Sequence, residues 1–295
     1  MPRGISSVEI LLLSALFVFA FLSRLVPLLP FGRVGFDPLF HYEFSVALLT
    51  GQTSIAIVTQ LGEHVTLYYP PLFHLLSLIL FLVFPAADPY LIMKIIVTAL
   101  GSLQVLPIYF IVKGVSKSVT GGMLAAFLVA TTPSEFHMLS WGGYANIAAF
   151  LLLTTLAYVV ISGKPVATLV VSTLLFLTHH LSMLFAIGLF VPYLVLAWWE
   201  TGKLPKCLVS LFASMAVAFG IFYWYALVPL FETYTQYAPR YAEFTLRSSW
   251  PELFGLPLLV LAVSGVVLWL YKSKIGFGQS EQLLLMWLLW PLLFS

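Results

Sequence analysis

The run GFDPLFHYEFS, residues 35–45, contains the first side chains that could do chemistry. Asp37 precedes Pro38, whose fixed φ suits the first turn of a helix, so we expect Asp37 at a helix N-terminus with His41 one turn further on. In that arrangement Asp37 would act as a general base or hold a divalent metal, with His41 supporting it. The alternative is that Asp37 only caps the helix, which is worth about 0.5–2 kcal/mol.

A second candidate is the run YYPPLFHLL, residues 68–76. Pro70 and Pro71 force an extended segment and then permit a helix to start, which places His74 in the first turns of that helix. Tyr69 and His74 are therefore candidates for substrate binding. The alternative is that the prolines only end a segment and that His74 is an interfacial residue.

The third candidate is TPSEFHMLSWGGYANI, residues 132–147. Two glycines in a row allow a sharp turn or a close approach of the backbone to a ligand. The helix start that follows, near Tyr144 to Asn146, would favour an anion such as a phosphate. Glu135 and His137 could face the same space. An ordinary turn between two helices is the alternative.

Two later segments add candidates. His179 and His180 lie between two short apolar runs, and a polar residue at such depth indicates function. Adjacent helical residues do not share a face, so we do not expect a two-histidine metal site, and one histidine bonded within the bundle explains the pair equally well. Arg240 and Arg247 lie in a late loop and could bind a phosphate, or could instead pair with the acids around them, of which Glu243 is one.

Composition places these residues in a membrane protein. Hydrophobic residues make up 61% and charged residues 8% of the 295, whereas soluble domains are about 25% charged. The net charge of +2 gives no reason to expect a nucleic-acid partner, and the single Cys207 excludes an internal disulfide. No Walker loop, dinucleotide fingerprint or HExxH motif is present.

Apolar stretches of about 17–25 residues predict an all-α polytopic membrane protein with about nine spans. We place the spans near 8–30, 91–112, 119–134, 145–161, 166–180, 181–199, 207–229, 252–271 and 281–295. The short run from Pro70 to Pro85 is expected to be a re-entrant or interfacial hairpin inside a first outer loop at about 31–90. A late outer loop is expected at about 231–250. The last apolar stretch is short, so the chain is expected to be truncated at its C-terminus.

The hairpin assignment follows from the positive-inside rule. It puts Arg3 and seven lysines on one face, which would be cytoplasmic together with the N-terminus. The seven are Lys113, Lys117, Lys164, Lys203, Lys206, Lys272 and Lys274. Eight of the 11 acids, and nearly all the residues able to do chemistry, then lie on the outer face of a cell membrane.

The order of these motifs resembles the GT-C superfamily of membrane glycosyltransferases, and most of all the catalytic subunit of oligosaccharyltransferase and its archaeal relatives. The resemblance covers about residues 8–162 by motif. It implies that Asp37 is the catalytic aspartate of the first acidic motif and helps to hold Mg or Mn. Family members carry two further acids where this chain has Ala145 and Ile147, and the acceptor-recognition motif Trp-Trp-Asp-Tyr-Gly is absent from the sequence.

The leading hypothesis is an outward-facing glycosyltransferase that moves a sugar from a polyprenyl-phosphate or polyprenyl-diphosphate donor to an unknown acceptor. Residues 1–295 would form one GT-C-like transmembrane domain, embedded in membrane lipid. The alternative from another class is a non-catalytic polyprenyl-lipid-binding or assembly subunit of the same fold. A lipid or solute transporter is a third, which the one-sided polar residues disfavour.

Overall fold

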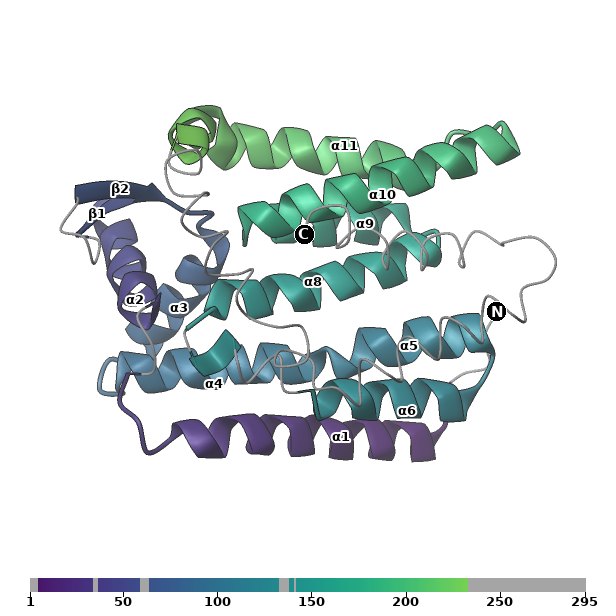
Figure 1. The fold of residues 1–295 in the computed structure, drawn as a ribbon, viewed down its shortest axis with the longest axis horizontal. Coiled ribbons are helices and arrows are strands. Elements are labelled where there is room, and N and C mark those ends of the chain that lie inside the picture. The colour runs from purple at the N-terminus through teal and green to yellow at the C-terminus, as the bar shows by residue number, and fades with distance from the viewer. Residues whose placement is uncertain (1–4, 34–36, 59–63, 133–137, 141, 233–295) are drawn as a thin grey trace, which may run out of the picture.

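The protein is described by a computed structural model that covers residues 5–33, 37–58, 64–132, 138–140 and 142–232. Most of its helices run in roughly the same direction and form a bundle (Figure 1). The helices are α1 (Ser7–Leu25), α2 (Asp37–Ala47), α3 (Leu72–Val83), α4 (Pro89–Leu103), α5 (Val105–Ser116), α6 (Val119–Ala130), α8 (Tyr144–Ile161), α9 (Pro165–Phe176), α10 (His180–Thr201) and α11 (Lys206–Ala218). Short 3₁₀ turns follow α1 (η1, Val26–Leu28) and α2 (η2, Leu48–Thr50), and a π-helical turn (η3, Phe219–Tyr223) follows α11.

Helix breakers and caps fix most of these boundaries. Ser6 and Glu9 form a capping box at the start of α1, and the Asp88 side chain caps α4. Gly163 and Gly202 adopt positive φ, at 63° and 67°, where α8 and α10 end. Such left-handed positions close a helix without the penalty that a side chain would add, so these turns are sharp.

Within the described part of the chain, five helical segments are long and apolar enough to cross a membrane. They are Ser7–Leu28, Pro89–Ser116, Tyr144–Ile161, His180–Thr201 and Lys206–Glu232. The helical membrane architecture expected from the sequence is therefore confirmed, and helices occupy seven of the predicted span positions. The count of nine stays a prediction, because residues 252–271 and 281–295 lie outside the described part of the chain.

The segment predicted as the first outer loop is more regular than the sequence indicated. Strands β1 (Ser54–Val58) and β2 (His64–Tyr68) pair antiparallel, with Ser54 opposite Tyr68 and Val58 opposite His64. This β-hairpin is distinct from the re-entrant hairpin expected at residues 70–85. We did not predict it, because the search for long apolar windows passes over five-residue strands. Helix α3 then fills the apolar run from Pro70 to Pro85, and its 12 residues extend for only about 18 Å, which is too short to span a bilayer. Whether α3 re-enters the membrane stays a prediction.

The two ends of the bundle differ in character (Figure 1). Helices α2 and α3 and the two strands lie together at one end, which we call the hairpin end. The connections from α5 to α6, α8 to α9 and α10 to α11 lie at the other end, which we call the lysine end after Lys113, Lys117, Lys164, Lys203 and Lys206.

Apolar packing and a few buried charges hold the bundle together. One cluster joins α8, α9, α10 and α11 through Leu156, Phe176, Phe190 and Leu211, each 0–1% exposed. A second cluster joins α1, α5 and α6. In water, burying one such large side chain stabilises a fold by about 1.5–3 kcal/mol through the hydrophobic effect. In lipid that effect is absent between helices, and van der Waals contacts from close packing stabilise the bundle instead.

Two cations anchor the end of α1 to its neighbours. Arg24 is fully buried and donates to the Ser102 hydroxyl (3.3 Å) and the Val129 carbonyl (2.8 Å). Lys94 donates to the carbonyls of Leu28 and Phe31 in the segment that leads from α1 toward α2. These bonds position the chain just before Asp37.

Candidate functional site

Asp37 is the first residue of α2 and packs against the two-glycine turn that precedes α8. Gly142 has a φ of +94°, and a Cβ built there would lie 2.3 Å from Pro38 Cδ and 3.0 Å from Asp37 Cβ. Only glycine fits this contact, because a side chain would meet both the steric overlap and an unfavourable backbone conformation. The sharp turn expected at Gly142 therefore exists, and what approaches it closely is the Asp37–Pro38 step.

His41 lies one turn along α2 and pairs with His74 of α3. Nδ1 of His41 is 2.9 Å from Nε2 of His74, and Nδ1 of His74 is 3.3 Å from the Pro70 carbonyl oxygen. His41 is 3% exposed and His74 is 0% exposed, so protein atoms enclose both rings. The structure thus joins two motifs whose pairing could not be read from the sequence.

Tyr69 links this pair to the start of α10. Its ring lies edge-on to His74, with the centroids 5.3 Å apart, and it also contacts His179 at 5.9 Å and His180 at 5.4 Å. Four histidines from three segments therefore surround one tyrosine. His180 belongs to this cluster, although only His179 was predicted as a site residue.

His179 itself has a structural task. Its Nδ1 accepts the backbone N–H of Ser182 (3.2 Å), which caps the N-terminus of α10, and lies 2.9 Å from the Ser182 hydroxyl. The structural alternative is therefore confirmed for His179, and its role in a site beside Tyr69 stays a prediction.

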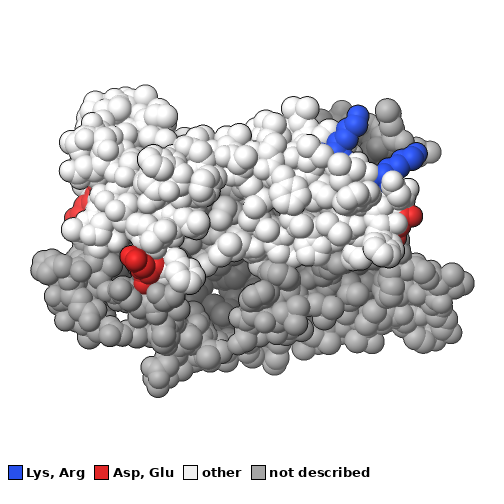
Figure 2. Space-filling view, turned by 90° about the horizontal axis from the view of Figure 1, so that it is seen from above, with Lys and Arg blue, Asp and Glu red and all other residues white. Residues whose placement is uncertain are grey.

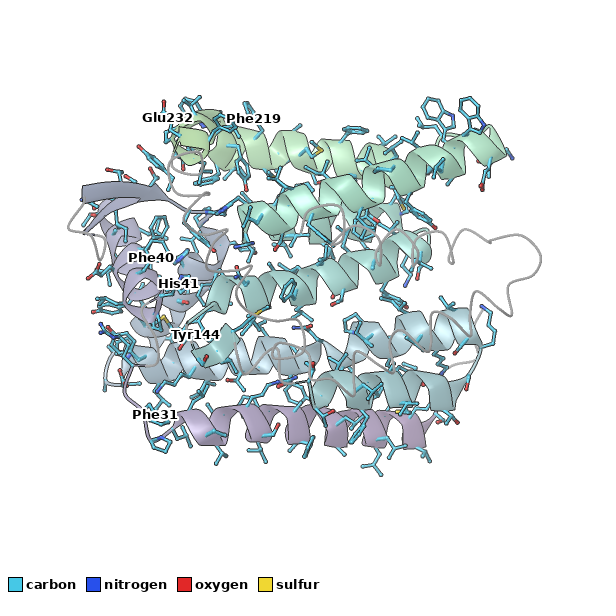
Figure 3. The ribbon with its side chains drawn as sticks, viewed as in Figure 1. Phe31, Phe40, His41, Tyr144, Phe219 and Glu232 are labelled. Carbon is cyan, nitrogen blue, oxygen red and sulfur yellow. The ribbon has the colours of Figure 1, made fainter. Side chains whose placement is uncertain are left out.

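Tyr144 closes the cluster from the side of α8. It is 1% exposed, and its ring stacks on that of His41, with the centroids 5.8 Å apart and the planes 17° apart. Phe40, His41 and Tyr144 lie near one another at the hairpin end (Figure 3). Asn146 is half-buried one turn into α8, at the helix start predicted to bind a phosphate.

Four predicted site residues lie outside the described part of the chain. They are Glu135, His137, Arg240 and Arg247, so their predicted roles stay predictions.

Burial sets the protonation of the two leading residues. Burial raises the pKa of Asp37 from 3.8 to about 6, so its carboxyl group is mostly ionised at neutral pH but is a better base than an exposed aspartate. Burial lowers the pKa of His41 to about 3, so its ring is neutral at every physiological pH. Asp37 is thus suited to take a proton, and His41 is suited to orient a hydrogen bond.

Charge also separates the two ends of the protein. Figure 2 shows blue lysine and arginine side chains at one end and acidic side chains mainly at the other. Asp37, Glu43, Asp88 and Glu232 belong to the hairpin end, together with the histidine cluster. Glu9 and Glu200 lie at the lysine end, so the separation is partial, and which end faces outward stays a prediction.

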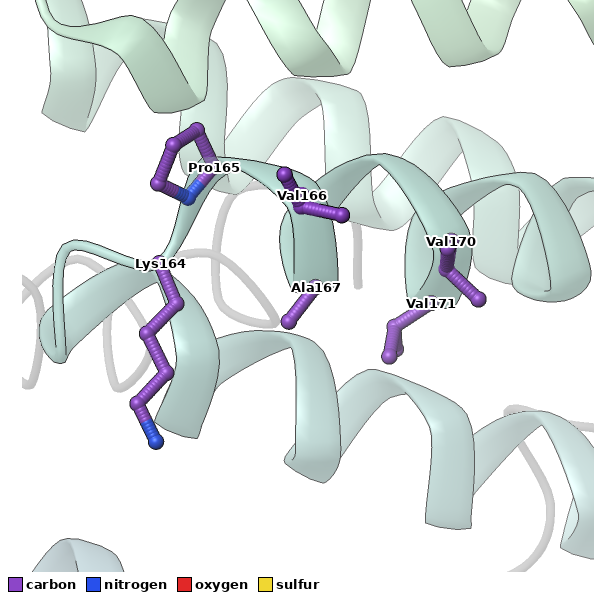
Figure 4. Close-up of a pocket in the computed structure, with 6 residues that line it drawn as sticks. All are labelled: Lys164, Pro165, Val166, Ala167, Val170 and Val171. Atoms are coloured by element: carbon purple, nitrogen blue, oxygen red, sulfur yellow. The ribbon is translucent and has the colours of Figure 1, made fainter.

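One hollow lies beside the site and another lies far from it. A hollow of about 490 Å³ lies between α2 and β1 and is lined in part by Tyr42, Glu43 and Gln52. Another, of about 570 Å³, lies at the lysine end, where Lys164 and the valines of α9 line it (Figure 4). Lys164 extends there to 5.2 Å from the centre of the Tyr158 ring. Because this second hollow is at the opposite end from Asp37, it has no part in the candidate site.

Whether Asp37 holds a metal stays a prediction, because Glu135 and His137 lie outside the described residues. The described residues include no group of three or more His, Cys, Asp or Glu side chains arranged to hold an ion. Ala145 and Ile147, which stand where the resembled family has acids, are each 1% exposed in the apolar core. We therefore derive no step through a metal.

No protein family matches this chain, and no curated protein matches its sequence.

Proposed function

We propose that this protein is an outward-facing membrane glycosyltransferase that uses a polyprenyl-phosphate or polyprenyl-diphosphate sugar as donor. The observation that carries the proposal is the convergence of Asp37, His41, His74, Tyr69 and Tyr144 at the hairpin end of an apolar bundle. The motif resemblance to GT-C enzymes supports it independently.

In this proposal Asp37 is the general base. Its carboxylate takes the proton of an acceptor hydroxyl or amide while the acceptor atom bonds to the anomeric carbon of the sugar. The bond from that carbon to the phosphate oxygen breaks, and the electron pair leaves with the polyprenyl phosphate. A pKa of about 6 matches this task, because the carboxylate is ionised at neutral pH and still basic.

The rest of the chain would serve the donor. The apolar bundle would hold the polyprenyl chain, and Arg240, Arg247 and the start of α8 near Tyr144 would bind the phosphate that leaves. Glu135, His137 and Asn146 are proposed to border the same space. Donor phosphates would then meet Asp37 at the membrane surface rather than in its interior.

A specific observation favours a second candidate, a non-catalytic subunit that binds the same class of lipid. At the two positions where the resembled enzymes have acids, this chain has the buried apolar side chains of Ala145 and Ile147. A protein that had lost catalysis but kept its lipid would show this change.

One assay separates the two candidates. Purified protein in lipid nanodiscs is incubated with a panel of polyprenyl-phosphate and polyprenyl-diphosphate sugars, and both sugar release or transfer and retained lipid are measured. Asp37→Asn is the test variant, and Glu43→Gln is its control, because Glu43 is an exposed carboxylate on the same helix. A chelator arm tests whether Asp37 also holds Mg or Mn.

An enzyme should transfer sugar in the wild type and in Glu43→Gln, and should lose transfer but keep lipid in Asp37→Asn. Lipid bound equally by all three proteins, with no transfer from any donor, would support the binding subunit. Equal transfer by the wild type and by Asp37→Asn would overturn the role of Asp37.

A further inference from the structure

The pair of histidines has a defined direction of hydrogen bonding. The Pro70 carbonyl oxygen can only accept, and it lies 3.3 Å from Nδ1 of His74. Nδ1 of a neutral His74 must therefore carry the hydrogen, which leaves a lone pair on its Nε2. That lone pair accepts a hydrogen bond from Nδ1 of His41, 2.9 Å away.

The result for His41 is a fixed tautomer. Its hydrogen is on Nδ1, so its other nitrogen, Nε2, carries a free lone pair. The segment that contains Pro70 is held in place by a backbone hydrogen bond. Leu72, two residues after Pro70, donates its N–H to the Leu177 carbonyl at 2.8 Å. Pro70 is itself buried and precedes the first turn of α3.

The opposite tautomer has weaker support at Gly142. His41 also lies against the Gly142 backbone, and this contact raises the pKa of His41. Only a hydrogen-bond acceptor stabilises the protonated ring, so the Gly142 group that His41 faces is the carbonyl oxygen. That carbonyl already accepts the Tyr144 N–H at 2.6 Å. The Gly142 carbonyl therefore does less than the Pro70 carbonyl to set the tautomer of the neutral pair.

The surroundings keep the pair neutral. The titratable groups packed against it are Tyr69 before α3 and Tyr144 of α8. Asp37 lies one turn before His41 on the same helix, and His179 and His180 lie against Tyr69. Of these groups Asp37 is the one that carries a charge at neutral pH. Complete burial disfavours any charge on the two imidazoles.

We propose that His74 is a positioning residue that holds His41 in the tautomer with hydrogen on Nδ1 and a lone pair on Nε2. His41 then accepts a hydrogen bond from one N–H of an incoming amide acceptor and orients the amide toward Asp37, which takes the other N–H proton. This role rests on the proposed function, whereas the tautomer itself does not.

The direct test is ¹⁵N NMR of the protein with labelled histidine, in which the two tautomers have different chemical shifts. Three variants accompany the wild type. His74→Leu removes the acceptor for Nδ1 of His41, and His74→Gln retains an acceptor oxygen near the position of Nε2. Ser77→Ala is the control, because Ser77 is buried on the same helix and bonds only to the Phe73 carbonyl of its own helix.

We expect His41 of the wild type, of Ser77→Ala and of His74→Gln to be neutral with hydrogen on Nδ1 at pH 7. His74→Leu should lose that preference. If transfer activity is found, His74→Leu should lower kcat about 10–100-fold with little change in KM, and His74→Gln should recover most of it.

Hydrogen on Nε2 of wild-type His41, or the same tautomer in the wild type and in His74→Leu, would overturn the proposal. If His74→Leu does not fold, the wild-type spectrum and His74→Gln still decide the tautomer. Absence of any transfer activity would instead refute the proposed function and leave the tautomer assignment to stand or fall on the spectra.

Discussion

Replacing Asp37 by asparagine should stabilise the folded protein at neutral pH while removing its activity. Burial raises the pKa of the Asp37 carboxyl from 3.8 to about 6, a change of about two units. Each unit corresponds to about 1.4 kcal/mol of preference for the neutral form, so a buried carboxylate would cost about 3 kcal/mol. Asp37 keeps some contact with solvent, so we expect a gain of about 1–2 kcal/mol from Asp37→Asn.

The pH dependence of this gain has a definite sign. Between about pH 4 and pH 6 the folded protein binds more protons at Asp37 than the unfolded chain, so the free energy of unfolding falls as pH rises through this window. The cost of the ionised carboxylate is complete above pH 6 and absent below pH 4. The stability gain of Asp37→Asn should therefore appear at pH 7.5 and vanish near pH 4.

Thermal or denaturant unfolding in detergent micelles at these two pH values measures the effect. Glu43→Gln serves as the control and should lie within about 0.5 kcal/mol of the wild type at both. A loss of stability in Asp37→Asn at pH 7.5, or a gain that does not change with pH, would refute the reasoning that burial perturbs this carboxyl group.

Two further predictions concern the packing of the site and its side of the membrane. Gly142→Ala should cost about 1–3 kcal/mol more in the free energy of unfolding than Gly163→Ala, because both have positive φ but a Cβ at Gly163 meets nothing within 4 Å. Equal costs in a thermal unfolding assay would mean that the contact with the start of α2 is not tight. In a Cys207→Ser background, Glu43→Cys should react with an impermeant maleimide added to intact cells, and Lys117→Cys only after permeabilisation. Labelling of both from the same side would contradict the orientation.

Helix positions were predictable because glycine, proline and lysine mark the ends of the apolar runs. Gly163 lies between the predicted spans 145–161 and 166–180, and Gly202 lies between 181–199 and 207–229. The helices on either side follow from length and hydropathy. The strands were missed, although the runs from Ser54 to Val58 and from His64 to Tyr68 contain β-branched residues at the density typical of strands. A search for short strands as well as long apolar windows would have found them.

The candidate site was predictable in its residues but not in its contacts. Asp37 and His41 belong together through helical spacing, which can be read from the chain. The bond from His41 to His74 joins positions 33 residues apart, and the α2–α3 packing that makes it depends on tertiary structure. The N-cap that His179 forms at the start of α10 could not be predicted either, because histidine is not among the residues that typically cap a helix.

The measurement that tests the central claim most directly is the pH dependence of sugar transfer, with the donor that the panel identifies. If Asp37 is the base, kcat/KM of the wild type should fall about tenfold for each pH unit below about 6 and stay level above it, and Asp37→Asn should show neither the activity nor the inflection. Because the pKa of His41 is about 3, that ring should add no inflection between pH 5 and pH 8. A flat profile from pH 5 to pH 7, or transfer by Asp37→Asn at the wild-type rate, would contradict the claim.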